Sequence, residues 1–166
     1  MFDSGAKTWV KFDQWPPRNL RETSAYFMRG RSLSLRVPPN DEQGFDQYVS
    51  DPKSPVPSEG GVLASRTREY MINDQRFATG RPDVLAYQTP VLTQDVTVVG
   101  PVFADLWAQL TTTDADFVVK LIDVFPPDAA GKLADYQMLV RGEIMPARFR
   151  KSFQNPKPMP VGAPEL

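Results

Sequence analysis

Residues 116–126 form the most apolar run of this chain. Seven of the ten residues from Asp116 to Phe125 are apolar, and several are β-branched or aromatic. This composition is typical of a strand that is covered on both faces. Periodicity alone does not separate such a run from a buried helix, but its length and the following Pro126–Pro127 favour a strand.

Alternation of apolar and polar residues predicts further short strands. It is cleanest in Leu33–Val37, where the apolar residues stand at odd positions. Tyr26–Val37 as a whole holds two apolar pieces around Arg29–Arg31, which we interpret as a hairpin turn. The longest alternating segment is Val96–Leu110, whose two faces are both partly apolar. We also expect strands at Thr8–Trp15, Phe45–Val49, Val84–Thr89, Tyr136–Val140 and Ile144–Phe149.

The segments between these strands are rich in proline and glycine. Pro38–Gly61 is the least regular, and we interpret it as a long ordered loop rather than a linker between domains. Ser65–Met71 is the best helix candidate, and Asp74–Pro82 is expected to be a loop. The tail 155–166 is proline-rich and expected to be extended and poorly ordered. Short strands separated by turns predict an all-β fold, a jelly-roll β-sandwich with at most one or two short helices, forming a single domain over residues 1–166.

Composition limits what this chain does by itself. It has 166 residues, enough for one domain with a core, and its net charge of −1 gives no field to attract nucleic acid or an anionic membrane. No apolar run approaches the roughly 20 residues of a membrane-spanning helix. The chain contains no cysteine and no histidine, which excludes disulfides, a thiolate nucleophile and a Ser-His-Asp triad within it. We expect no cofactor, no metal, and no nucleic-acid or membrane partner; composition leaves the compartment open.

Several segments, taken in order, resemble one family of domains. They are Phe2-Asp3-Ser4-Gly5, Trp9, Trp15-Pro16-Pro17, Ser50-Asp51-Pro52, Pro55-Val56-Pro57, Asp74-Gln75-Arg76-Phe77, Arg81-Pro82-Asp83-Val84-Leu85, Leu92, Asp95, Gly100-Pro101, Asp114 to Val124, and Arg148-Phe149-Arg150. Each piece is weak alone, but their order and spacing extend over nearly the whole chain. Together they resemble the C-terminal β-sandwich domain of the X-Pro dipeptidyl-peptidase-like serine hydrolases. That group includes cocaine-esterase-like and α-amino-acid ester hydrolases and glutaryl-cephalosporanic-acid acylases.

The resemblance implies a jelly-roll (galactose-binding-like) domain that packs against an α/β-hydrolase domain of the same parent chain. In that family the catalytic serine, acid and histidine lie in the hydrolase domain, so the resemblance assigns no catalytic residue to this chain. It also implies that the chain is truncated at both ends, because the family continues with further strands after Phe153. A truncated sandwich would leave an unpaired edge, and a homo-oligomer is therefore left open.

Two Asp–Arg pairs stand close together in the sequence: Asp74 with Arg76, and Arg81 with Asp83. One interpretation is an anion or substrate contact. The other, which we favour, is a loop held by bidentate arginine–carboxylate bonds, because no other chemistry lies nearby in sequence.

Asp114, Asp116 and the threonines at 111–113 offer hard oxygen ligands. A calcium site is conceivable, since loop carboxylates and carbonyls often hold calcium. The spacing matches no EF-hand loop, however, and two carboxylates at a turn are common. We therefore expect no metal here.

Trp9, Phe12 and Trp15 form an aromatic group near the beginning of the chain. They could be a sugar-stacking platform, but core or interdomain packing is the interpretation we favour. Trp107 presents the same choice. The sequence thus predicts an ancillary domain of a serine hydrolase that acts on ester or amide bonds; the alternative is an independent carbohydrate- or ligand-binding module.

Overall fold

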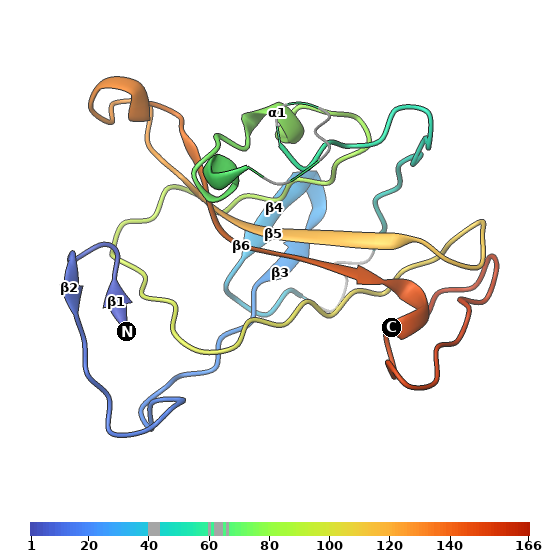
Figure 1. Ribbon diagram of the computed structural model, residues 1–166, viewed down its shortest axis with the longest axis horizontal. Helices are drawn as coiled ribbons and strands as arrows, with labels where there is room; N and C mark the ends of the chain where they lie inside the picture. The colour runs from blue at the N-terminus through green and yellow to red at the C-terminus, as the bar shows by residue number, and fades with distance from the viewer. Residues whose placement is uncertain (40–43, 60, 62–64, 66) are drawn as a thin grey trace. The chain divides into compact units, whose positions relative to one another are not determined.

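The computed structural model describes residues 1–39, 44–59, 61, 65 and 67–166. In this part of the chain the regular structure is mostly strand, arranged as three antiparallel two-stranded sheets (Figure 1). The strands are β1 (Phe2–Asp3), β2 (Thr8–Trp9), β3 (Tyr26–Met28), β4 (Ser32–Ser34), β5 (Asp116–Val124) and β6 (Gln137–Pro146). The helical segments are α1 (Arg76–Thr79) and single 3₁₀ turns at Arg29–Arg31, Arg68–Met71, Gly131–Leu133 and Ala147–Phe149.

The predicted all-β class is therefore confirmed, whereas the jelly-roll arrangement stays a prediction. Among the described residues no helix is long and apolar enough to cross a membrane. The chain divides into two compact units: Met1–Gly44 with Tyr87–Phe103, and Phe45–Ala86 with Ala104–Leu166. We describe each unit by itself.

The first unit begins with the β1–β2 hairpin. The Asp3 carboxylate accepts hydrogen bonds from the backbone N–H groups of Gly5 and Ala6, at 3.0 and 2.9 Å, and so fixes the turn. The ladder extends to Met1, whose backbone oxygen accepts a hydrogen bond from the Val10 N–H at 2.8 Å. The predicted strand at Thr8–Trp15 was therefore too long: the strand is β2 alone, since the pairing with the first residues of the chain ends at Val10.

The β3–β4 hairpin confirms the turn predicted at Arg29–Arg31. Gly30 has a φ of 69°, a left-handed conformation that glycine adopts without a steric penalty. The predicted strand Leu33–Val37 was wrong in its extent, because β4 ends at Ser34. The Ser34 hydroxyl accepts a hydrogen bond from the Arg36 N–H at 3.0 Å, and this local bond replaces a ladder bond.

The β5–β6 hairpin is the largest element of the second unit. β5 confirms the strand predicted from residue 116, but not its burial on both faces, because Val118 is 55% exposed. The two strands predicted at 136–140 and 144–149 are instead one strand, β6. A β-bulge makes this continuity possible: Leu121 pairs with Arg141 while Ile122 pairs with Leu139, so the register shifts by one residue.

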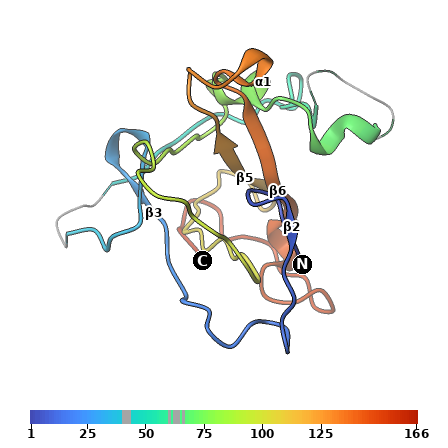
Figure 2. The ribbon, with the colours of Figure 1, turned by 90° about the vertical axis from the view of Figure 1, so that its left-hand side faces the viewer.

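Four other predictions were wrong in type or extent. The predicted strand at Phe45–Val49 is not formed. In the predicted helix 65–71 the helical part is the 3₁₀ turn Arg68–Met71, and Arg66 lies outside the described residues. The predicted strand 84–89 contributes only a bridge from Gln88 to Ser32. The predicted loop at 74–82 contains α1, which begins where the Asp74 carboxylate accepts a hydrogen bond from the Arg76 N–H at 3.1 Å. α1 lies against the start of β6, where the Gln75 N–H donates to the Gln137 oxygen at 3.0 Å (Figure 2).

The proline-rich tail is held by backbone hydrogen bonds, which corrects the expectation of poor order. The N–H groups of Met159 and Gly162 donate to the oxygens of Thr113 and Leu110, both at 2.8 Å. Ala108 and Glu165 exchange two further bonds. In the predicted strand 96–110 only Ala108 and Leu110 form bridges, both with the tail, so an extended segment with few partners replaces the strand.

Candidate functional site

Arg81 and Asp83 form a two-pronged ion pair. Arg81 Nε and Nη2 donate to the two Asp83 carboxylate oxygens, each at 2.8 Å. The Arg81 hydrogen bond lowers the pKa of Asp83 below its usual value. Arg81 Nη2 also donates to the Ser54 backbone oxygen at 2.9 Å. The guanidinium therefore ties two loops of the second unit together, 27 residues apart in sequence.

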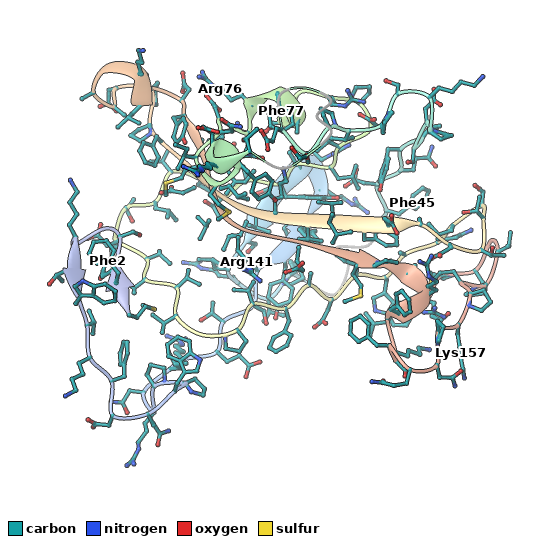
Figure 3. All side chains as sticks on the ribbon, in the orientation of Figure 1. Phe2, Phe45, Arg76, Phe77, Arg141 and Lys157 are labelled. Carbon is teal, nitrogen blue, oxygen red and sulfur yellow. The ribbon has the colours of Figure 1, made fainter. Side chains whose placement is uncertain are left out.

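Asp74 and Arg76 form the second pair at the beginning of α1. Arg76 Nε donates to Asp74 Oδ2 at 2.7 Å, while the Gln137 N–H donates to Oδ1 at 3.3 Å. Desolvation raises the pKa of Asp74, but the hydrogen bonds from Arg76 and Gln137 outweigh it and hold the pKa below the usual value. Arg76 and Phe77 both extend from α1 (Figure 3). The carboxylates of Asp74 and Asp83 are thus each paired with an arginine of their own loop.

A buried polar cluster lies beside this loop, and sequence reasoning missed it. Gln75 is fully buried, and its side-chain oxygen accepts a hydrogen bond from Lys120 Nζ at 2.7 Å. Lys120 Nζ also lies 5.4 Å from the centre of the Phe77 ring, a cation–π arrangement. Burial lowers the pKa of Lys120. A lone lysine within an apolar strand was the sequence signal that a polar partner must lie opposite it.

Glu59 is the other buried member of this region, only 4% exposed. Its carboxylate accepts hydrogen bonds from the Thr67 N–H at 3.1 Å, the Thr67 hydroxyl at 2.8 Å and Asn73 Nδ2 at 3.2 Å. These bonds connect three parts of the loop region that precedes α1. Nothing in the sequence around Glu59 distinguished it from an exposed acidic residue.

The two acidic residues considered as calcium ligands, Asp114 and Asp116, have different surroundings. Asp114 forms an ion pair with Arg148 and accepts hydrogen bonds from the N–H groups of Ala115 and Arg148, both at 3.1 Å. The Arg148 hydrogen bond lowers the pKa of Asp114. Asp116 is exposed and lies opposite Pro146 at the beginning of β5. Among the described residues no group of three or more acidic, histidine or cysteine side chains could hold a metal ion.

A further ionic group, not foreseen from the sequence, holds the tail. The Glu165 carboxylate accepts hydrogen bonds from Lys151 and, at 2.6 Å, from Arg150 Nη2. Both bonds, that of Lys151 first, lower the pKa of Glu165. Arg150 Nη1 donates in addition to the Lys157 backbone oxygen at 2.7 Å. These basic residues therefore serve internal contacts.

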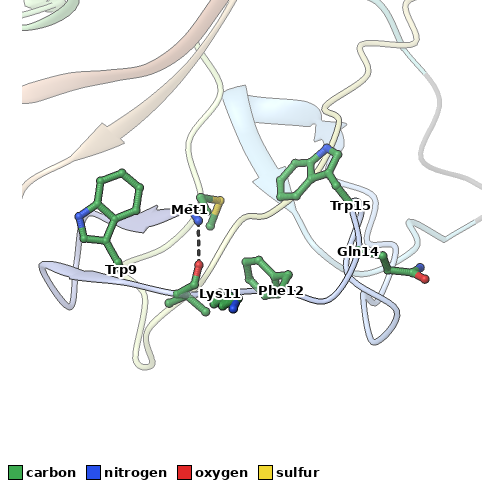
Figure 4. Close-up of a pocket in the computed structure, with 7 residues that line it drawn as sticks. Met1, Trp9, Lys11, Phe12, Gln14 and Trp15 are labelled. Atoms are coloured by element: carbon green, nitrogen blue, oxygen red, sulfur yellow. Dashed lines mark hydrogen bonds between the residues drawn. The ribbon is translucent and has the colours of Figure 1, made fainter.

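Three aromatic residues of the first unit, Trp9, Phe12 and Trp15, line an open hollow of about 490 Å³. Figure 4 shows Trp9 and Trp15 at the two ends of the lining segment, with Phe12 and Met1 between them. Trp9 is 79% exposed and Trp15 60% exposed. Each indole packs edge to face with one phenyl ring. The ring centres of Phe2 and Trp9 are 5.5 Å apart, and those of Phe12 and Trp15 are 6.4 Å apart. The rings therefore form a surface rather than a core within this unit.

Trp107, in the second unit, is 74% exposed. Together these contacts describe an all-β protein module whose paired polar side chains connect its own segments and whose three tryptophans are exposed to solvent. The sequence lacks histidine and cysteine altogether, so it contains no general base of the usual kind for a serine or thiol nucleophile.

Comparison with known proteins identifies the family of this module. Residues 1–164 match the X-Pro dipeptidyl-peptidase C-terminal non-catalytic domain, and the chain belongs to this family. It is 33% identical over 171 residues to a cocaine esterase of Rhodococcus sp. (strain MB1 Bresler). The matched region covers 98% of this chain and 28% of that protein.

Two solved structures agree with this assignment. A crystal structure of an aminopeptidase from the marine sediment archaeon Thaumarchaeota archaeon superposes with a TM-score of 0.88 at 34% identity, covering 99% of this chain and 28% of the other. An α-amino acid ester hydrolase superposes with a TM-score of 0.80 at 34% identity, covering 96% and 27%. The chain thus spans little more than a quarter of the length of these relatives, and the resemblance inferred from the sequence is confirmed.

Proposed function

We propose that this chain serves a larger α/β-hydrolase as its ancillary C-terminal domain, which packs on the catalytic domain and stabilises it. The catalytic serine, acid and histidine would lie in the part that precedes Met1. The parent would hydrolyse acyl ester or amide bonds, since the relatives include an esterase, an ester hydrolase and an aminopeptidase. We also propose that residues 1–166 act as one jelly-roll domain within that protein.

The observation that carries this proposal is the exposure of large apolar side chains. Among the described residues only Leu139, Ala147 and Met159 are buried hydrophobic residues. Among the exposed ones, Phe45 is 87%, Phe103 81% and Val91 87% exposed. Scattered exposed apolar residues are ordinary, but large aromatic and aliphatic groups exposed in such number favour contact with another protein surface.

In this proposal the residues singled out from the sequence divide by role. The tryptophans at 9, 15 and 107 are interdomain contacts, because they are large, apolar and mostly exposed. Asp74, Arg76, Arg81 and Asp83 are structural, because each is paired within its own loop. Asp116 is structural at the start of β5, where it faces Pro146 across the ladder.

The alternative, a carbohydrate- or ligand-binding module, has one observation in its favour: the hollow beside Trp9 and Trp15. A sugar site needs several oriented polar groups beside the aromatic rings. The polar side chains that line this hollow are Lys11 and Gln14, and the Gln14 side-chain oxygen already accepts a hydrogen bond from Arg18 Nε at 2.9 Å. The apolar lining favours protein contact.

Reading the gene upstream of Met1 tests the proposal directly. We expect a hydrolase domain with a Gly-x-Ser-x-Gly nucleophile elbow. A serine-directed phosphonate should then label one serine of the purified full-length protein, upstream of residue 1 and nowhere within 1–166. The absence of any hydrolase domain upstream would contradict the proposal, and so would phosphonate labelling with turnover at a serine of this chain.

A further inference from the structure

We propose that the hollow lined by Met1, Trp9, Val10, Phe12 and Trp15 is the anchor point of the interdomain interface. Its occupant would be an apolar side chain of the catalytic domain. This inference rests on the proposed function and specifies which surface of the chain makes the contact. We call this surface the Trp9–Trp15 hollow.

The chemistry of the lining selects an apolar occupant. Two indoles, a phenyl ring, a valine and a methionine line the hollow, and Lys11 and Gln14 are its polar members. The hollow is open to solvent and its volume is about 490 Å³, which is enough to receive one or two large side chains. Tryptophan is enriched among the residues that dominate binding energy at protein interfaces, where it fills or forms desolvated pockets.

In the proposed function the catalytic domain precedes residue 1, and this order makes that domain the source of the occupant. Met1 lines the hollow itself, and its nitrogen donates to the Val10 oxygen at 2.7 Å, as the dashed line in Figure 4 shows. A peptide N–H at this position would make the same hydrogen bond, so the β1–β2 ladder accommodates a preceding residue without change. A domain attached at Met1 is thus tethered beside the hollow, and a short tether gives a high effective concentration for contact.

Charge does not oppose this docking. The segment from Met1 to Trp15 contains Lys7 and Lys11 against Asp3 and Asp13, so its side chains carry no net charge. Neither basic nor acidic partners are selected, and burial of apolar surface is the remaining source of affinity. The exposed fractions of Trp9 and Trp15, 79% and 60%, are the surface that such burial would remove from water.

Oxidative footprinting of the full-length protein tests the inference without altering any residue. Hydroxyl radicals label exposed tryptophan, and mass spectrometry compares each tryptophan in the native protein with the same tryptophan in urea. The contacts within this chain leave Trp9 and Trp15 mostly exposed, so without a partner both should be labelled nearly as fast as in the unfolded protein. Docking should reduce the labelling of both about tenfold, as expected for the desolvated centre of an interface.

A pair of matched variants adds a second measurement. In the full-length protein, Trp9→Ala should raise the labelling of Trp15 severalfold, because losing one side of the hollow admits water to the other. Phe153→Ala removes an aromatic ring of similar exposure, 66%, from the second unit at a position that the proposal places in no interdomain contact, and it should leave the labelling of Trp15 unchanged.

The outcomes separate this inference from the proposed function. Full labelling of Trp9 and Trp15, with protection at other apolar residues of the chain, would overturn the hollow and leave the docking of the domain intact. No protection anywhere in 1–166 would overturn both. Protection that arises only when an oligosaccharide is added would make the hollow a sugar site and also refute the inference.

Discussion

Replacing Glu59 with glutamine probes the hydrogen bonds around this buried carboxylate with the smallest change of shape. The carboxylate is 4% exposed and accepts three hydrogen bonds, one at Oε1 from the Thr67 N–H and two at Oε2 from the Thr67 hydroxyl and Asn73 Nδ2. Glutamine has the same volume, but one of its two terminal atoms is a donor. The substitution therefore changes hydrogen bonding and charge while it preserves packing.

In either orientation the nitrogen of the new amide faces a group that donates in the present arrangement. If the amide nitrogen replaces Oε2 it faces the Asn73 amide, and if it replaces Oε1 it faces the Thr67 backbone N–H. The Thr67 hydroxyl can rotate and accept, the Asn73 amide can accept only by turning over to present its oxygen, and the Thr67 backbone N–H cannot accept at all. One unsatisfied buried donor costs about 1–3 kcal/mol, so Glu59→Gln should lower the free energy of unfolding by about that amount.

Urea titration monitored by circular dichroism measures this difference, provided the slope of the transition is unchanged. Glu69→Gln is the matched control, because Glu69 is exposed and the same chemical change there should cost less than about 0.5 kcal/mol. Equal unfolding free energies for the two variants would refute the argument that the Glu59 cluster is buried and satisfied.

Exchange of the two partners provides a rescue. Asn73→Asp alone places a second carboxylate where Asn73 Nδ2 lies 3.2 Å from Glu59 Oε2, and repulsion should destabilise the protein. Combined with Glu59→Gln, the new amide donates to the new carboxylate, so the double variant should be more stable than the sum of the single effects predicts. Strict additivity would show that the two side chains do not interact.

Three further predictions follow from the contacts described above. Leu139→Ala should lower the free energy of unfolding by about 2–5 kcal/mol, because Leu139 is 4% exposed. Val140→Ala, at the half-exposed bulge, should lower it by less than about 1 kcal/mol. Equal losses for the two variants in urea titrations would contradict the burial of Leu139. The pKa of Asp114 is lowered by Arg148, so this pair stabilises the fold above the unfolded pKa of about 3.9 and loses that contribution as the pH falls through the folded value. Asp114→Asn should therefore reduce stability at neutral pH and flatten the acid decline in urea midpoints, and a variant with an unchanged pH profile would count against the pair. The isolated chain should not hydrolyse activated esters above background; stoichiometric labelling of one of its serines with turnover would disprove this.

The sequence predicted elements well where local signals were strong. The hairpin at Arg29–Arg31 was predicted because a glycine between two apolar pieces is a direct turn signal, and Gly30 does adopt a positive φ. The strand from residue 116 was predicted from its apolar run. The strand predicted at 96–110 failed because alternation reports which face a side chain would occupy, not whether a backbone partner exists.

Part of the candidate site was also predictable. The Asp74–Arg76 and Arg81–Asp83 pairs are two residues apart, so the sequence placed the partners together. Arg148 with Asp114, Lys120 with Gln75 and Glu165 with Arg150 are 34, 45 and 15 residues apart and were missed. No local pattern specifies which distant oxygen an arginine or lysine will reach.

The sequence by itself determined the class and the family, and it shows that histidine and cysteine are absent, because these depend on composition and on the order of short motifs along the chain. Only the tertiary structure decided that the tail pairs with residues 108–113, that β6 is one strand with a bulge, and that Trp9 and Trp15 face solvent around a hollow. Burial and pairing are properties of the environment that distant segments create, and an apolar side chain has the same identity whether or not that environment covers it.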